Sequence, residues 1–184
     1  TIKDVLVRIC QSRRSMYLFK VDRKKEKLED FKTAISSTVR SLTNSNKIEV
    51  SFGNTSTNSS IKSIELPELN YSQNKINFDE IRAIADSKSL LHRFSNNKIL
   101  KRYEPEGNIS KKLYKISEKI RCENIGSNYF KFIKNNIEKF YLKRLDGLDL
   151  KSSEDKIIES FENYLRIKFL DLKNDKLIDK KLKS

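Results

Sequence analysis

The sequence has few of the residues on which most catalytic and cofactor sites depend. Its 184 residues include four glycines, two prolines, two cysteines, one histidine and no tryptophan. So few and so widely separated glycines form neither a phosphate-binding P-loop nor a dinucleotide-binding fingerprint. The one histidine, His92, has no cysteine near it in the sequence, so a Cys–His nucleophile pair and a zinc hydrolase both lack their parts. We therefore expect no catalytic residue, no metal and no cofactor in this chain.

Cysteine and long apolar runs are also scarce. Cys10 and Cys122 are too few for a disulfide framework, which fits a reducing compartment. No apolar run approaches the roughly 20 residues of a transmembrane helix. The N-terminus lacks the apolar core and the small-residue cleavage site of a signal peptide. These features predict a cytoplasmic protein without a membrane partner.

Positive charge is abundant. The chain has 39 basic and 25 acidic residues, a formal net charge of +14. Residues 98–144 hold 13 Lys and Arg against 5 Asp and Glu, a difference of +8, which suggests a basic helical nucleic-acid-binding module. However, 28 of the 39 basic residues are lysine, and the chain is rich in asparagine and isoleucine; A/T-rich codons favour all three. Much of the charge is then compositional, and nucleic-acid binding is the alternative interpretation.

The spacing of apolar residues predicts a mainly α fold with about five to six helices, as a single helical domain over residues 22–172. Between the first two helices, alternating residues predict strands that pair in one small β-hairpin at about residues 48–66. Residues 1–21 form an N-terminal arm, which could be a short helix and strand or a segment that docks elsewhere. Residues 173–184 form a charged C-terminal tail.

Each expected helix has an apolar stripe and a signal at one end. Asp22 caps a helix over residues 24–43, Asn77 caps one that runs to about residue 97, and Ser152 or Ser153 caps the last. Asp146 and Gly147 end the helix before it. The inward residues of the last helix are expected to be Ile157, Ile158, Phe161, Leu165, Phe169 and Leu172.

The helix over residues 109–125 is the centre of the prediction. Its stripe ends where Glu123 occupies a position that calls for an aliphatic residue, and Gly126 then offers a residue on which helices commonly end. A carboxylate at the edge of the core requires a partner, such as Arg82 or Arg93. The stripe itself consists of Ile109, Leu113, Ile116 and Ile120.

Several short strings resemble the N-terminal region of the T subunit of aerobic cobaltochelatase, the CobT family. Their order and intervals agree with that family over about residues 31–144. The strings are Phe31-Lys32 with Ala34, Ile48 to Gly53, Leu66 to Leu69, Ala85 to Ser87 with Leu90, Pro105 to Gly107, and Tyr114 to Ser127 with Glu118, Arg121, Glu123 and Gly126. The string that begins at Tyr114 is the most specific.

The resemblance implies a part in cobalamin biosynthesis. The cobaltochelatase complex inserts cobalt into hydrogenobyrinic acid a,c-diamide at the expense of ATP. The resemblance therefore implies ATP, magnesium and cobalt for the complex and no cofactor for this chain. The implied partners are an AAA+ ATPase subunit of S type and a large macrocycle-binding subunit of N type. Association of the chain with further copies of itself is left open as an alternative. The family continues into a von Willebrand A-type domain, so we expect this sequence to be part of a longer subunit.

The residues that match the family motifs are the candidates for interaction. They are Asp86, Pro105, Glu106, Gly107, Glu118, Arg121, Glu123 and Gly126. Glu118 and Arg121 could instead form an ordinary surface pair, and Glu123 could serve either structural pairing or partner binding. A third interpretation of the charge is a lysine-rich surface for acidic lipid or for the family's acidic linker.

Overall fold

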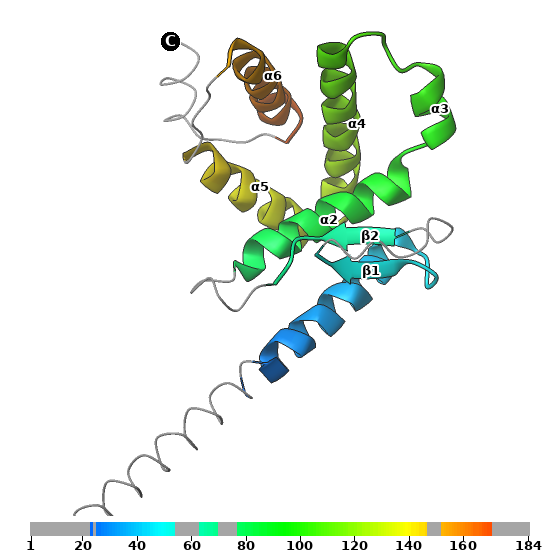
Figure 1. Cartoon of the computed structure of the whole chain (residues 1–184), viewed down its shortest axis with the longest axis vertical. Helices are drawn as coiled ribbons and strands as arrows, with labels where there is room; N and C mark the ends of the chain where they lie inside the picture. Colours follow the sequence, from blue (N-terminus) through cyan, green and yellow to red (C-terminus); the bar gives the residue numbers. More distant parts are fainter. Residues whose placement is uncertain (1–22, 24, 54–62, 70–76, 147–151, 171–184) are drawn as a thin grey trace, which may run out of the picture. The chain divides into compact units, whose positions relative to one another are not determined.

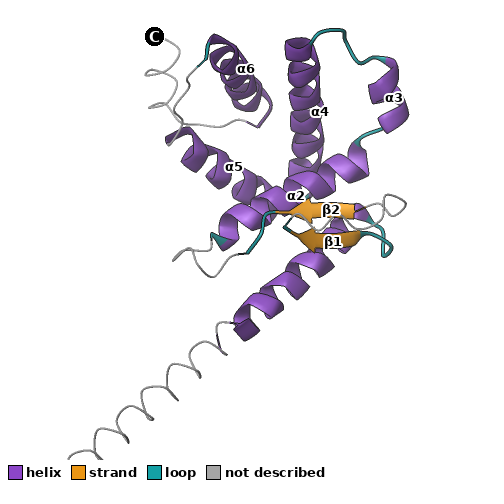
Figure 2. Cartoon of the chain, in the orientation of Figure 1, coloured by secondary structure: helices purple, strands orange, loops and turns teal. Residues whose placement is uncertain are grey.

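The computed structural model describes residues 23, 25–53, 63–69, 77–146 and 152–170. A first helix covers residues 25–43. The elements after it are β1 (Glu49–Phe52), β2 (Ser63–Leu66), α2 (Phe78–Phe94), α3 (Asn97–Arg102), α4 (Asn108–Tyr129), α5 (Lys131–Asp146) and α6 (Ser153–Leu170). Helices dominate the described chain, so the predicted mainly α fold is confirmed (Figure 2). Among the described residues, no helix is both long and apolar enough to cross a membrane.

The chain divides into two compact units, residues 1–38 and residues 39–184. In the described part of the first unit, Leu28 and Ile35 are buried, as the helical spacing of the sequence predicts. Lys32 and Glu29 form an ion pair on the exposed side of the same helix. The predicted cap Asp22, the N-terminal arm and the C-terminal tail lie outside the described residues.

The predicted hairpin is wrong, because β1 and β2 pair in parallel. Both strands lie where the alternation placed them, with Val50 opposite Ile64 and Phe52 opposite Leu66. Alternation fixes which face of a strand is buried and carries no information on its direction. A turn of two to five residues would require an antiparallel pair. The two strands are separated by residues 53–62, a connection too long to impose that direction. Lys88 of α2 donates to the carbonyl oxygen of Glu65 at 2.5 Å and ties α2 to β2.

Helix α2 is the central element of the second unit. It packs against both α4 and α5, and α4 in turn packs against α5 and α6 (Figure 1). The core cluster gathers residues from the end of the first helix, α2, α5 and α6. Its members are Leu42, Leu90, Ile133, Ile137, Tyr141 and Leu170.

Helix ends follow the predicted signals in two places. The Asn77 side chain accepts from the Glu80 backbone N–H and donates to the Glu80 carboxylate, which makes the expected capping box. The Ser152 hydroxyl accepts from the Asp155 backbone N–H at 3.0 Å and caps α6. The second expected helix ends earlier than predicted, at Phe94, because Asn96 caps the separate short helix α3.

Gly126 does not end its helix, which is a correction. Helix α4 continues to Tyr129, and Gly126 lies buried inside it. A Cβ atom at Gly126 would lie 2.9 Å from Cγ of Leu90 and closer still to its two methyl carbons. The glycine is therefore explained by the close approach of α4 to α2 rather than by a left-handed backbone.

The predicted inward face of α6 is also wrong in part. Ile157 and Phe169 are exposed, and Leu172 lies outside the described residues. The residues that α6 buries are Glu159, Glu162, Arg166 and Leu170. A helix can bury charged side chains in this way only where they are paired, and the pairing forms the centre of the site described next.

Candidate functional site

The predicted candidates fall into two groups in the structure. Asp86, Glu123 and Gly126 are buried where α2 and α4 pack together, with Glu118 and Arg121 at the edge of that junction. The second group, Pro105 to Gly107, forms the turn before α4, in which Glu106 and Gly107 are exposed. The sequence strings therefore mark one buried junction and one surface turn.

Glu123 is fully buried and paired on both carboxylate oxygens. Its Oε2 atom lies 2.6 Å from Nη1 of Arg166, and its Oε1 accepts from the Ser87 hydroxyl at 2.5 Å. The predicted partners Arg82 and Arg93 are wrong. Arg93 donates instead to the Leu42 carbonyl oxygen, and Arg166 comes from α6, 43 residues further along the chain. One buried carboxylate thus joins α2, α4 and α6.

The pair extends into a network that reaches α5. Arg166 also donates to Glu162 at 2.7 Å. Arg144 of α5 donates to Glu159 at 2.6 Å and to Glu162 at 3.3 Å. We call the charged residues of this network, with Lys119 and the hydroxyl of Ser87, the charged cluster. Its charged members are Lys119, Glu123, Arg144, Glu159, Glu162 and Arg166. Its three carboxylates and three cations balance in charge, which is the condition for burying them.

Tyr141 of α5 forms the apolar floor of the charged cluster. The guanidinium carbon of Arg166 lies 3.2 Å from the centre of the Tyr141 ring, a stacked cation–π contact. The Tyr141 hydroxyl accepts from the Lys119 ammonium at 2.7 Å. Burial lowers the pKa of Lys119 and raises that of Tyr141, because each would have to carry its charge away from water.

The electrostatics of the cluster favour the ionised forms of Glu162 and Arg166. Burial pushes the pKa of Glu162 upward, but the guanidinium groups of Arg166 and Arg144 more than offset this, so the pKa ends below its usual value. Burial pushes the pKa of Arg166 downward, and Glu123 and Glu162 more than offset that in turn. Glu162 and Arg166 are therefore held as fixed charges by their partners in the cluster.

Asp86 lies in the same junction under different conditions. It is buried, and burial raises the pKa of its carboxyl group, although the amide of Asn136 and the charge of Arg82 act in the opposite direction. Its Oδ2 accepts from the Asn136 side chain at 2.9 Å. No ion pair of Asp86 with a cation occurs among the described residues, so this carboxylate is held at a cost to stability.

Arg121 and Glu118 form the pair that the sequence predicts. The Arg121 Nε atom lies 2.7 Å from Oε2 of Glu118 on the surface of α4. Arg121 also donates to the carbonyl oxygen of Phe94, the last residue of α2, at 2.9 Å. Because terminal helix carbonyls lack partners in their own helix, this bond caps α2 from α4. The role in joining two helices exceeds that of an ordinary surface pair.

Cysteine adds no reactive group to the junction. Cys122 is a buried free thiol next to Glu123, and burial together with the charge of Glu118 raises its pKa to about 12. The thiol is therefore protonated and a poor nucleophile at neutral pH. In the part of the chain that the structure describes, no group of three or more His, Cys, Asp or Glu side chains is placed to hold a metal ion.

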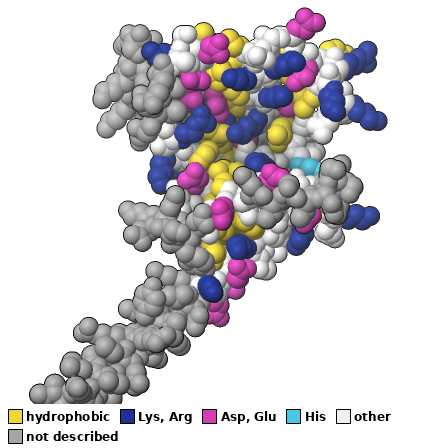
Figure 3. Space-filling view, in the orientation of Figure 1, with side chains coloured by type: hydrophobic (Ala, Val, Ile, Leu, Met, Phe, Trp, Pro, Cys, Tyr) yellow, Lys and Arg dark blue, Asp and Glu magenta, His cyan; other side chains and the backbone are white. Residues whose placement is uncertain are grey.

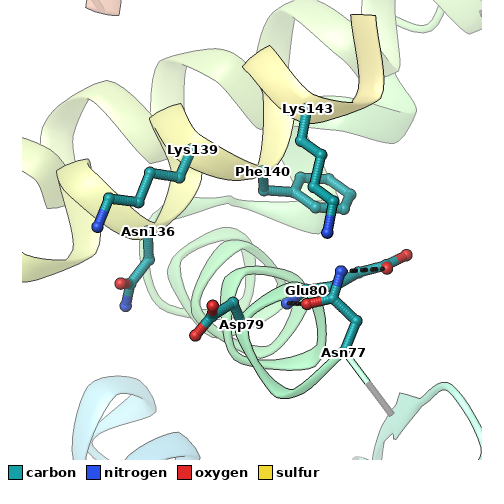
Figure 4. A pocket seen from close by; sticks show the side chains of 7 residues that line it. All are labelled: Asn77, Asp79, Glu80, Asn136, Lys139, Phe140 and Lys143. Atoms are coloured by element: carbon teal, nitrogen blue, oxygen red, sulfur yellow. Dashed lines mark hydrogen bonds between the residues drawn. The ribbon is translucent and has the colours of Figure 1, made fainter. Parts of the chain in front are cut away.

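A small pocket lies between the start of α2 and the middle of α5 and encloses about 130 Å³ (Figure 4). The side chain of Lys143 reaches down toward Asn77 and Glu80, while Asp79 faces the same hollow. The lining residues are Asn77, Asp79, Glu80, Asn136, Lys139, Phe140 and Lys143. Two carboxylates and two ammonium groups oppose each other there, so the pocket has no single charge with which to select a ligand.

The sequence prediction missed the partners of Glu123. Ser87 stands in a matched string without a predicted role. The pair of Glu159 and Glu162 is expected by chance in so charged a chain, and the sequence predicts no role for Arg166. A signal for them exists: Glu159, Glu162 and Arg166 are three and four residues apart, which places them on one face of a helix. A charged stripe beside an apolar stripe would have indicated two competing faces for α6.

One of the comparisons with known proteins finds a matching family. A family model described as cobalamin biosynthesis protein CobT matches residues 25–157, well over half of the chain. Neither the curated proteins nor the solved structures give a match. The matched region includes the junction of α2 and α4 and the turn before α4, and it ends just after the start of α6.

Proposed function

This chain belongs to the CobT family of cobalamin biosynthesis proteins, and we propose that it is the non-catalytic N-terminal domain of a cobaltochelatase T subunit. In this proposal it supports ATP-dependent insertion of cobalt into hydrogenobyrinic acid a,c-diamide in the cytoplasm. The S-type ATPase binds ATP and magnesium, and the N-type subunit binds the macrocycle and receives the cobalt. The chain contributes by docking these partners.

The observation that supports a scaffold role is what the motif residues do. Glu123 is occupied by Arg166 and Ser87, Gly126 by the packing of Leu90, and Arg121 by Glu118 and the end of α2. These polar atoms are engaged with one another and join three helices, which supports a structural role for the motif residues. They fix the angle at which α2, α4 and α6 meet, and so they fix the surface that a partner reads.

The turn before α4 is the part of the family motif that a partner can reach. Gly107 has φ of 90°, a conformation that side chains other than glycine rarely adopt, and Glu106 is exposed beside it. An exposed carboxylate in such a turn suits a charge contact with a partner. We therefore place one docking contact at Glu106.

The test is reconstitution with the S-type and N-type subunits encoded in the same genome. Size-exclusion chromatography of the mixture, with ADP and with a non-hydrolysable ATP analogue, measures association. We expect a complex with the S-type ATPase, and a Glu106→Lys variant should weaken it roughly tenfold. Association that is absent in every nucleotide state would overturn the proposal.

Glu104→Lys is the matched control. Glu104 lies in the same turn, outside the family string, and faces Lys115 at 3.5 Å in a largely exposed pair. The change of charge is identical, so an effect of Glu106→Lys that Glu104→Lys does not share locates the contact at Glu106. Equal loss in both variants would indicate general electrostatic attraction in place of a specific contact.

A second candidate, nucleic-acid binding, is favoured by one observation. Tyr129 and Phe132 are strongly exposed, and Arg93 lies over the ring of Phe94, which stacks on Tyr129. Aromatic rings beside cations are typical of single-strand binding surfaces. Against it, basic side chains on the face in Figure 3 are interspersed with acidic and apolar ones. Affinity for a labelled single strand that falls steeply between 50 mM and 200 mM salt would favour this function, whereas flat or absent binding would remove it.

A further inference from the structure

Helix α6 has its amphipathic faces reversed. Its buried side carries Glu159, Glu162 and Arg166, while its exposed side carries large apolar residues. Ile157 is 54% exposed and Tyr164 is 53% exposed. A soluble helix usually shows the opposite arrangement, and an exposed apolar stripe of this kind marks an interaction surface.

Four of the exposed residues form a regular seam together with Phe161, and the exposed Phe169 lies outside it. Glu154, Ile157, Phe161, Tyr164 and Lys168 follow one another at steps of three, four, three and four residues. This spacing is the repeat with which one helix packs along another. Phe161 lies at the middle of the seam and is half-buried, and the seam has an acidic end and a basic end.

We propose that this seam pairs with the same seam of a second copy of the chain, antiparallel and around a two-fold axis at Phe161. Glu154 and Lys168 are each seven residues from Phe161, so an antiparallel pair brings Glu154 of one copy opposite Lys168 of the other, twice. Ile157 then faces Leu165, which is half-buried beside the seam. A parallel pair would place glutamate against glutamate and lysine against lysine.

Charge selects a second copy as the occupant. Both end residues are exposed, and they are about 21 Å apart along the helix. Antiparallel pairing also opposes the two helix dipoles, and Asp155 in the first turn adds negative charge at the acidic end. The two-fold arrangement uses the same patch on both copies, as the commonest oligomers do.

The pair is expected to be weak. One helix seam buries less than a standard interface, and the net charge of +14 on each copy opposes association. The dimer should therefore form with rising protein concentration, from about micromolar upward. This inference does not depend on the family role, since it concerns only the surface of α6.

The test is a charge swap in the 184-residue chain, followed by sedimentation equilibrium. Glu154→Lys and Lys168→Glu each place like charges at both ends of the pair and should weaken the dimer roughly tenfold. The double variant Glu154→Lys with Lys168→Glu restores opposite charges and should restore the dimer. An equimolar mixture of the two single variants should form a heterodimer, because their ends are complementary.

Lys156→Glu is the matched control, since Lys156 is exposed on α6 away from the seam. It should leave the dimer unchanged, and thermal unfolding should show that every variant is folded. A chain that stays monomeric at all concentrations would overturn the proposal. So would a dimer that the single variants leave intact, or one that the double variant fails to restore.

Discussion

Helix α4 supplies the carboxylate of two carboxylate–arginine pairs whose atoms are nearly the same distance apart. One pair is fully buried and the other is partly exposed. Glu123 lies 2.6 Å from Arg166, with 0% and 1% of their side chains exposed. Glu118 lies 2.7 Å from Arg121, with 13% and 49% of their side chains exposed. When the surface pair breaks, water replaces each partner, but when the buried pair breaks nothing does. Distance alone therefore says little about what a pair contributes.

The two pairs also differ in what they connect. Glu118 and Arg121 are three residues apart in one helix, whereas Glu123 and Arg166 are 43 residues apart and join α4 to α6. The buried pair therefore specifies tertiary structure. The surface pair acts between elements only through the bond from Arg121 to the carbonyl oxygen of Phe94.

The largest expected effect comes from removing the arginine of each pair. Arg166→Met leaves Glu123 and part of Glu162 without their buried partner and should lower the free energy of unfolding by about 3–5 kcal/mol. Arg121→Met removes a partly exposed pair and one terminal hydrogen bond, so about 1 kcal/mol is expected. Urea unfolding followed by circular dichroism measures both. Equal losses would break the comparison.

Gly126→Ala extends the comparison from charge to packing. The new methyl group would collide with Leu90, so the helices α2 and α4 must separate or Leu90 must leave its rotamer. We expect a loss of about 1–3 kcal/mol in the free energy of unfolding. Asn128→Ala, at an exposed site of the same helix, should change it by less than about 0.5 kcal/mol. If Gly126→Ala left the free energy of unfolding unchanged, the junction of α2 and α4 would be able to relax around the added methyl group.

Acid should distinguish the two environments next. The pKa of Glu162 lies below its ordinary value of 4.5, so the folded state binds fewer protons than the unfolded state. Its contribution is complete above pH 4.5 and is lost as the pH falls through the lowered folded pKa. Urea unfolding between about pH 6 and pH 3 should show this loss. Glu162→Gln should flatten the slope more than Glu118→Gln, whose carboxylate is more exposed; the reverse order would contradict the account.

The smallest effect is expected at Asp86. Its pKa is raised chiefly by burial, so the charged form at neutral pH opposes folding, and the penalty is relieved as the pH falls through the raised pKa. Asp86→Asn keeps an acceptor for Asn136 without the charge and should leave stability unchanged, within about 1 kcal/mol, or raise it slightly. A loss above about 2 kcal/mol, measured by urea unfolding at pH 7, would show that the carboxylate is compensated.

Much of the fold follows from local signals. Apolar spacing located the helices, and Asn77 and Ser152 marked two starts correctly, because a cap depends only on residues within one turn. The direction of β2 was beyond reach, since alternation is the same read from either end. Gly126 was misread because a glycine chosen for close packing looks in sequence like a glycine chosen for its backbone.

The site was predicted at its centre and missed around it. The apolar seam of α4 placed Glu123 at the edge of the core as a carboxylate that needs a partner. The structure buries it completely and pairs it with Arg166. The partner came from α6. The spacing of Glu159, Glu162 and Arg166 places them on one face of that helix, but it does not indicate which residue of another helix they meet. The orientation of α6 was missed for the same reason: its apolar stripe suggested one face, and only the charged groups of α4 and α5 favour the opposite one.

The most direct test of the scaffold account is a double-mutant cycle on the buried pair. Glu123→Gln, Arg166→Met and the double variant are compared by urea unfolding, alongside the same cycle on Glu118 and Arg121. We predict a coupling of about 2–3 kcal/mol for Glu123 with Arg166 and below about 1 kcal/mol for Glu118 with Arg121. Equal couplings, or a Glu123→Gln variant with unchanged melting temperature and unchanged complex assembly, would contradict the role assigned to this junction.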